Sequence, residues 1–116
     1  MTKSRTGYYQ GEVVLVRFIF TDESGAKQRP AVIISSDDYH SNRQEAIIAA
    51  ITSNVQRLLT GDHLIKDWQE TGLLHPSVAT SIIRTIKKGM IEQKLGEMPA
   101  ADFQVIQESM RQVLEL

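Results

Sequence analysis

The hydrophobic positions of this chain fall into short runs separated by polar turns, a pattern typical of a protein built mainly from strands. The first run, Glu12 to Phe20, is rich in valine, isoleucine and phenylalanine, which strands favour. Thr21 to Lys27 contains Asp22 and Gly25, which suit a tight turn. Apolar character returns at Ala31 to Ile34. This part of the chain therefore predicts a strand, a loop and a second strand.

The middle of the chain continues in short segments. After the polar stretch Ser35 to Gln44, the apolar run Ala46 to Ile51 is too short for a typical independent helix and predicts a buried strand. Gly61 to Lys66 and Val78 to Thr85 predict further short strands. Between them, Asp67 to Gly72 predicts a helical turn that ends at its glycine.

The apolar spacing changes at the end of the chain, where it predicts an amphipathic helix. Pro99 suits the first turn of this helix. Its apolar face consists of Phe103, Ile106, Met110, Val113 and Leu114. Several short strands and a terminal helix predict a mainly β fold, either a small barrel or a strongly bent sheet closed by the helix. A parallel α/β fold would need intervening helices that the pattern lacks.

Composition narrows the kinds of chemistry. A chain of 116 residues suits one hydrophobic core, so we expect one domain over residues 1–116. The absence of cysteine excludes disulfides, thiolate nucleophiles and iron–sulfur clusters. His40, His63 and His75 form no recognised ligand spacing with carboxylates. We therefore expect no metal site and no cofactor, and predict surface or hydrogen-bonding roles for the three histidines.

Charge and hydropathy indicate where the protein acts. The net charge of −1 argues against a strongly basic nucleic-acid binder, but the acidic tail from Glu97 onward leaves a positive excess in the body of the chain. Met1 to Gln10 lacks the apolar centre of a signal peptide. The longest apolar run, Ala46 to Ile51, is too short to cross a bilayer. We expect a cytoplasmic protein with no membrane span.

Three segments, taken in order, resemble the MazF/PemK toxins: Gly11 to Val16, Gln28 to Ser35 and Ala50 to Ser53. A fourth, Ile83-Arg84-Thr85, resembles the arginine-threonine step of a later strand in that family. Each motif alone is weak, and their shared order and spacing carry the resemblance. It implies an SH3-like small barrel, a homodimer, metal-independent and sequence-selective cleavage of single-stranded RNA, and neutralisation by a cognate antitoxin protein.

The resemblance also implies the site residues. The family's catalytic arginine and hydroxyl residue correspond here to Arg29 and Thr52. A guanidinium matches phosphate geometry and stabilises its charge, whereas its high pKa makes it a poor base. We therefore favour electrostatic stabilisation by Arg29 over proton transfer. Further predicted substrate-binding residues are Ser53, Arg84, Lys87 and Lys88.

Each of these residues also has an ordinary structural interpretation. Arginine beside a strand is often a solvated or paired charge, threonine is common in strands, and neighbouring lysines usually mark a solvated face. Ile82 stands where family members often carry a polar residue. A non-catalytic homologue that acts by protein binding therefore stays open. So does a gyrase poison like CcdB, although that family's Trp-Gly-Ile ending is replaced here by Leu114-Glu115-Leu116.

Overall fold

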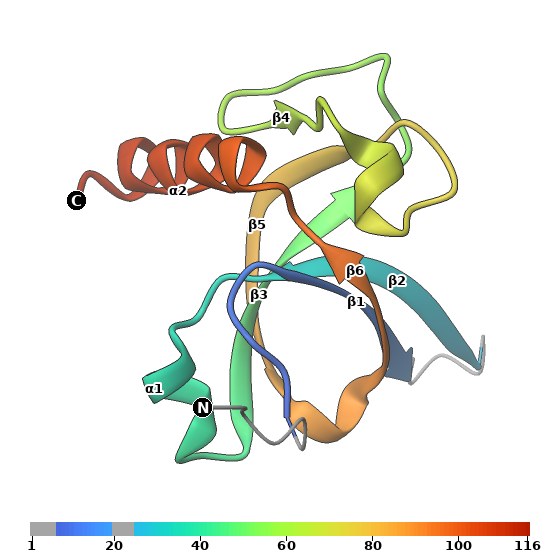
Figure 1. Cartoon of the computed structure of the whole chain (residues 1–116), viewed down its shortest axis with the longest axis vertical. Coiled ribbons are helices and arrows are strands. Elements are labelled where there is room, and N and C mark those ends of the chain that lie inside the picture. The colour runs from blue at the N-terminus through green and yellow to red at the C-terminus, as the bar shows by residue number, and fades with distance from the viewer. Residues whose placement is uncertain (1–6, 20–24) are drawn as a thin grey trace.

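The computed structural model describes residues 7–19 and 25–116, which form an antiparallel six-stranded sheet and a C-terminal helix (Figure 1). The strands are β1 (Glu12–Ile19), β2 (Ala26–Ile33), β3 (Glu45–Thr52), β4 (His63–Leu64), β5 (Val78–Lys87) and β6 (Ile91–Glu97). The α-helices are α1 (Asp37–Ser41) and α2 (Ala100–Leu114), and the short 3₁₀ helices are η1 (Trp68–Thr71) and η2 (Lys88–Met90).

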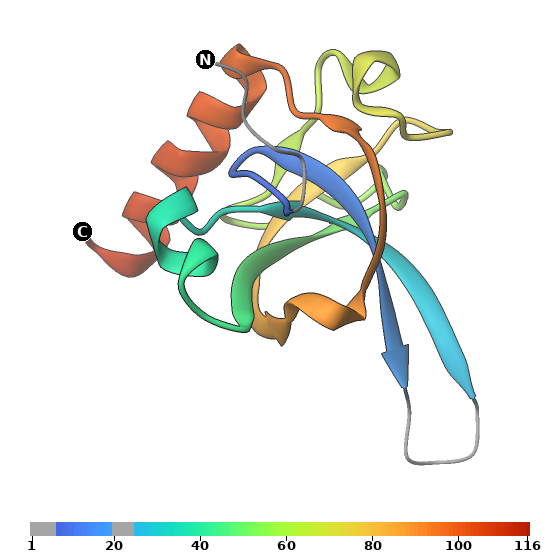
Figure 2. The same ribbon diagram turned by 60° about the horizontal axis from the view of Figure 1, so that its bottom comes forward.

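The strands follow the order β4-β5-β3-β2-β1-β6, and the sheet curls strongly around its own interior (Figure 1). β1 and β2 pair along their length and extend together away from the rest of the molecule (Figure 2). This architecture confirms the predicted mainly β fold with a terminal helix.

Both faces of the sheet are covered, which explains why the strand sequences read as continuous apolar runs rather than as alternating ones. Val13, Val32 and Ala49 pack on one face, together with Ile106 and Met110 of α2. On the other face, the apolar core consists of Val14, Val16, Ala31, Ile33, Ile48, Ile86 and Ile91. Because neighbouring residues of a strand point to opposite faces, β1, β2, β3 and β5 each contribute to both cores.

Most predicted elements are confirmed. β1, β2, β3 and β5 cover the predicted strands, and η1 ends at Gly72, which is left-handed with φ of 83°. The strand predicted over Gly61 to Lys66 was too long, because only His63–Leu64 pairs with β5. The predicted positions Phe20 and Thr21 to Ser24 lie outside the described residues.

Three features differ from expectation. The polar stretch contains the short helix α1, whose N-cap Ser36 accepts a hydrogen bond from the Tyr39 backbone N–H. β6 was missed because its sequence is largely charged and polar. In α2, Val113 and Leu114 are 43% and 51% exposed, whereas Ile106 and Met110 are buried in the core as predicted. None of the described helices is long and apolar enough to cross a membrane.

Candidate active site

A cavity of about 860 Å³ opens on the sheet face formed by β2, β3 and β5. The loop between η1 and β5, two residues of β1 and two residues of β6 complete its wall. Arg29, Thr52, Ser53 and Arg84, four of the residues predicted from the sequence, line this cavity. The fold therefore brings together side chains that are up to 55 positions apart in the chain.

The pairing of β2 with β3 explains why Arg29 and Thr52 line the same cavity. β2 and β3 are antiparallel and pair Ala31 with Ala50. The pairing ends there, and Arg29 and Thr52 each lie two residues beyond this last pair, toward the start of β2 and the end of β3. The alternation of strand side chains then places both on the same face. The pairing of β2 with β3 thus places both residues on the wall of one cavity.

Arg29 is exposed and lies on the wall of the cavity. Within residues 7–19 and 25–116, its guanidinium has no hydrogen-bond or ion-pair partner, whereas Arg17 and Arg43 each face a glutamate. The five N–H donors of an arginine form a fork that matches the oxygens of a phosphate. Arg29 is therefore available to bind an anion that enters the cavity.

Thr52 is the last residue of β3, and a hydrogen bond within the turn that follows orients its hydroxyl. Its Oγ1 accepts a hydrogen bond of 3.2 Å from the Asn54 backbone N–H. That contact uses an acceptor position of the hydroxyl and leaves its hydrogen available for a phosphate oxygen. Ser53, which follows directly, is exposed on the same cavity. Two hydroxyl groups therefore accompany the guanidinium of Arg29.

Arg84 reaches the cavity from β5, where it pairs in register with Ile48 of β3. Its guanidinium carbon lies 4.6 Å from the centroid of the Phe18 ring of β1. Stacking on an aromatic face restricts the guanidinium while leaving its N–H donors exposed at the edge. Arg84 thus presents a second, oriented cation to the cavity.

Lys87 and Lys88 are not among the described residues that line the cavity. Lys87 Nζ lies 3.3 Å from Glu45 Oε2, and the pKa of Glu45 is lowered by this contact first and by Arg43 second. Lys88 Nζ donates a hydrogen bond of 2.6 Å to the His40 carbonyl oxygen. The structure thus separates these two lysines from the other predicted site residues and gives both of them protein partners.

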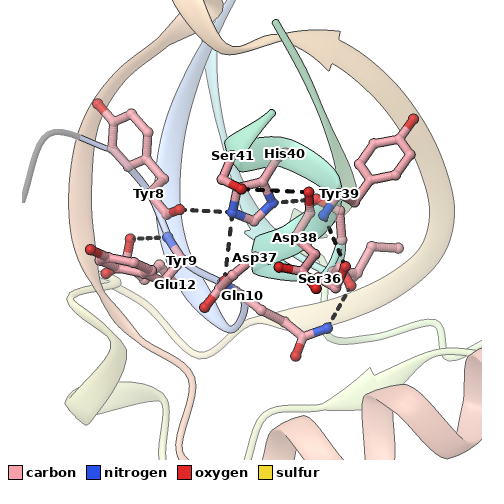
Figure 3. A network of polar contacts seen from close by, with 12 residues as sticks. Tyr8, Tyr9, Gln10, Glu12, Ser36, Asp37, Asp38, Tyr39, His40 and Ser41 are labelled. Atoms are coloured by element: carbon pink, nitrogen blue, oxygen red, sulfur yellow. Dashed lines mark hydrogen bonds and ion pairs between the residues drawn. The ribbon is translucent and has the colours of Figure 1, made fainter. Parts of the chain in front are cut away.

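Two of the histidines have hydrogen-bonding roles, as predicted. His40 of α1 is buried, and its Nε2 lies 2.8 Å from the Tyr8 carbonyl oxygen (Figure 3). Its Nδ1 lies 2.8 Å from Ser35 Oγ. His63 Nε2 lies 2.7 Å from Asp102 Oδ1. Both rings hold separate segments of the chain together.

His75 is the lining residue that the sequence did not reveal as part of a site. It lies in the loop before β5, is exposed, and borders the cavity that contains Arg29 and Thr52. Ile82, singled out earlier as a departure from the family pattern, also lines this cavity and is 62% exposed. No local motif marks His75, because its position depends on how the loop folds back. Among the described residues, no cluster of three histidine, aspartate or glutamate side chains is placed to hold a metal ion.

Comparison with known proteins identifies a family for the chain as a whole. Residues 9–114 match the family model described as PemK-like, MazF-like toxin of type II toxin-antitoxin system. Endoribonuclease MazF2 of Mycobacterium bovis and endoribonuclease MazF6 of Mycobacterium tuberculosis are each 33% identical to this chain over 93 residues. Each alignment covers 78% of this chain and 82% of the relative.

Solved structures share the fold. An endoribonuclease in complex with its cognate antitoxin from a mycobacterial species has a TM-score of 0.75 at 19% identity, covering 95% of this chain and 97% of that one. MazF in a MazE-MazF complex from Deinococcus radiodurans has a TM-score of 0.79 at 16% identity, with 94% and 96% covered. On the family match and the curated relatives, this chain belongs to the PemK-like, MazF-like toxins of type II toxin-antitoxin systems.

Proposed function

We propose that this chain is a sequence-selective, metal-independent endoribonuclease that cleaves single-stranded RNA, with Arg29 and Thr52 as its catalytic residues. The observation that carries the proposal is the convergence of Arg29 and Thr52 on one cavity, with Arg29 lacking a partner among the described residues. The relatives at 33% identity are named endoribonucleases, which supports the same activity.

The reaction begins when the 2′-hydroxyl of a ribose attacks the adjacent phosphorus. Negative charge builds up on the phosphate oxygens in the transition state, and preorganised donors that face this charge lower the barrier. Arg29 supplies two parallel N–H donors and a full positive charge. The Thr52 hydroxyl donates to a phosphate oxygen from the neighbouring strand. Cleavage leaves a 2′,3′-cyclic phosphate on one fragment and a 5′-hydroxyl on the other.

The remaining predicted residues hold the RNA. Ser53 and Arg84 bind the substrate inside the cavity, where the stacking of Arg84 on Phe18 fixes the direction of its donors. Lys87 is the last residue of β5 and Lys88 follows it. RNA that continues along β5 beyond Arg84 meets both lysines, which contribute charge to binding rather than to the reaction.

The proposal extends to partners and location. Structural neighbours were solved with their antitoxins, as MazE-MazF complexes and as an endoribonuclease with its cognate antitoxin. We infer that this toxin is likewise neutralised by its own antitoxin, and that it acts as a homodimer in the cytoplasm. Sedimentation equilibrium of the purified protein tests the dimer, and a monomer at micromolar concentration would contradict it.

The first experiment tests cleavage itself. Purified protein is incubated with a long single-stranded RNA in excess EDTA, and new ends are mapped by primer extension. We expect discrete cuts by the wild-type protein, and a loss of about 100- to 1,000-fold in rate for Arg29→Ala. Arg111→Ala is the matched control, because Arg111 is an exposed arginine on α2 that does not line the cavity. Absence of cuts by the wild-type protein under varied conditions would refute the proposal.

A further inference from the structure

Among the residues that the structure describes, one group lining the cavity is suited to proton transfer near neutral pH. Among the described residues that line the cavity, the ionisable side chains are Arg29, Arg84 and His75. A guanidinium stays protonated and cannot accept a proton at pH 7, and the hydroxyls of Thr52 and Ser53 are weak bases. Imidazole is the side-chain group that ordinarily titrates between pH 5 and 8. The chemistry of the lining therefore singles out His75.

The loop that carries His75 is fixed before the histidine. Gly72 begins it in a left-handed conformation and packs so closely on β6 that a Cβ atom there would lie 2.0 Å from the Leu95 carbonyl oxygen. The next residue, Leu73, donates its backbone N–H to Thr71 Oγ1 at 3.2 Å. Thr71 itself is fully buried. The first half of the loop is thus clamped between η1 and β6.

The loop is fixed after the histidine as well. Ser77 is buried, and its hydroxyl donates a hydrogen bond of 2.8 Å to the carbonyl oxygen of His75. The Ser77 carbonyl in turn accepts a hydrogen bond of 3.0 Å from the Ile65 backbone N–H. The His75 side chain is exposed at the cavity between these two anchors. Its backbone is therefore held in place while its ring remains accessible to a ligand.

We propose that His75 is the general base of the reaction. This inference rests on the proposed ribonuclease function and extends it by a third catalytic residue. The neutral imidazole takes the proton of the 2′-hydroxyl as the 2′-oxygen forms its bond to phosphorus and the bond from phosphorus to the 5′-oxygen breaks. The leaving 5′-oxygen takes a proton from water, and the hydroxide so formed is neutralised by the imidazolium. The other charged groups of the described lining, Arg29 and Arg84, face the phosphate.

The test compares His75→Ala and His75→Asn with the wild-type protein on a short single-stranded RNA that contains a mapped cleavage site. We expect kcat/KM to fall by about 100- to 10,000-fold at pH 7.5, with KM changed much less. A general base acts only when unprotonated, so the wild-type rate should fall on the acid side of its pH profile, and both variants should lose this acid limb. Added imidazole restores part of the His75→Ala rate in proportion to its unprotonated fraction.

His63→Gln is the matched control, because His63 binds Asp102 outside the cavity and glutamine retains a donor for that contact. It should keep both the wild-type rate and the acid limb. Thermal melts establish that each variant is folded, and the exposure of His75 predicts that its replacement is tolerated.

Distinct outcomes would overturn the assignment. Cleavage by His75→Ala at the wild-type rate would do so while leaving the proposed ribonuclease function intact. A slower His75→Ala that keeps the acid limb and gains nothing from imidazole would reduce His75 to a structural role. Rescue that follows the protonated form of imidazole would contradict the role of base. Failure of the wild-type protein to cut any RNA would overturn both proposals together.

Discussion

Arg29 at the cavity and Asp102 at the junction between α2 and β4 are both charged, but they differ in whether other groups of the protein satisfy the charge. Arg29 is exposed at the cavity and has no hydrogen-bond or ion-pair partner in the described chain. Asp102 of α2 is 3% exposed and accepts hydrogen bonds from the Lys66 and Asp67 backbone N–H groups at 2.9 and 3.2 Å. His63 Nε2 lies a further 2.7 Å away.

The comparison indicates that the charge of Asp102 serves the structure, whereas the charge of Arg29 is available to a ligand. A buried carboxylate without partners would cost several kcal/mol, so Asp102 is surrounded by donors that tie α2 to the chain around β4. Across the described residues, no buried side-chain nitrogen or oxygen lacks a hydrogen-bond partner. An arginine in a cavity needs no such partner, because water solvates it until an anion displaces the water. Replacing residues in the two regions should therefore affect different measurements.

Of the substitutions that compare these two regions, Arg29→Lys should have the largest effect. Lysine keeps the positive charge but replaces the planar fork with a single ammonium group, so bidentate contact with the phosphate is lost. We expect kcat to fall by about 100-fold or more, with an unchanged midpoint of urea unfolding. The measurement is single-turnover cleavage of the mapped RNA. Wild-type rates in this variant would mean that charge alone suffices and that the geometry of Arg29 is not used.

An intermediate effect, on stability rather than on cleavage, follows from Asp102→Asn. An amide offers one acceptor oxygen where the carboxylate offers two, so a donor at the α2 junction is left facing another donor. We expect a loss of about 1–3 kcal/mol in the free energy of unfolding, measured by urea denaturation, with kcat unchanged at temperatures where the variant is folded.

The pH dependence of this variant provides a second test. Burial opposes ionisation of Asp102, but hydrogen bonds from Lys66, His63 and Asp67 outweigh it and lower the pKa of the carboxyl. A lowered pKa in the folded state gives stability that is present above the unfolded pKa of about 3.9 and lost as pH falls through the folded value. The stability difference between wild type and Asp102→Asn should therefore shrink below about pH 4. A constant difference down to pH 2 would refute this account.

The smallest effect is expected for Lys87→Gln. Its side chain is 64% exposed and paired with Glu45, and exposed ion pairs contribute little to folding. If RNA extends along β5, the variant should cleave within tenfold of wild type. Its binding should also lose about 0.7 from the slope of log affinity against log salt. Fluorescence anisotropy at several salt concentrations measures this slope, and an unchanged slope would remove Lys87 from the RNA-binding surface.

The predictions made from sequence succeeded where the signal is local. Continuous runs of β-branched residues gave β1, β3 and β5, and Gly72 marked the end of η1. β6 gave no such signal, because its sequence is largely charged and polar. One of its charges, on Lys94, is satisfied only in the folded protein, by an ion pair of 3.0 Å with the buried Glu12 of β1. A strand stabilised by a distant partner has no pattern of its own to detect.

In the candidate site too, some residues could be predicted from local sequence and others could not. Arg29 and Thr52 were predicted because their motifs resemble a known family, and each lies just outside an apolar run that predicts a strand, Ala31 to Ile34 and Ala46 to Ile51. The observed strands β2 and β3 extend far enough to include both residues. His75 was not recognised as a site residue, because its place at the cavity depends on contacts of its loop with β6 and with Ile65. Lys87 and Lys88 lie close to Arg84 in sequence, yet the structure pairs them with Glu45 and with the His40 carbonyl.

The sequence by itself determined four of the six strands (β1, β2, β3 and β5), the terminal helix and the types of residue available for chemistry, because hydrophobic period and turn composition act over a few residues. Only the tertiary structure decided the strand pairing that brings Arg29 and Thr52 to one cavity, and the return of the 72–77 loop that brings His75 to the same cavity. Register and loop placement depend on contacts between residues far apart in the chain, and the pattern of any one segment does not encode those contacts.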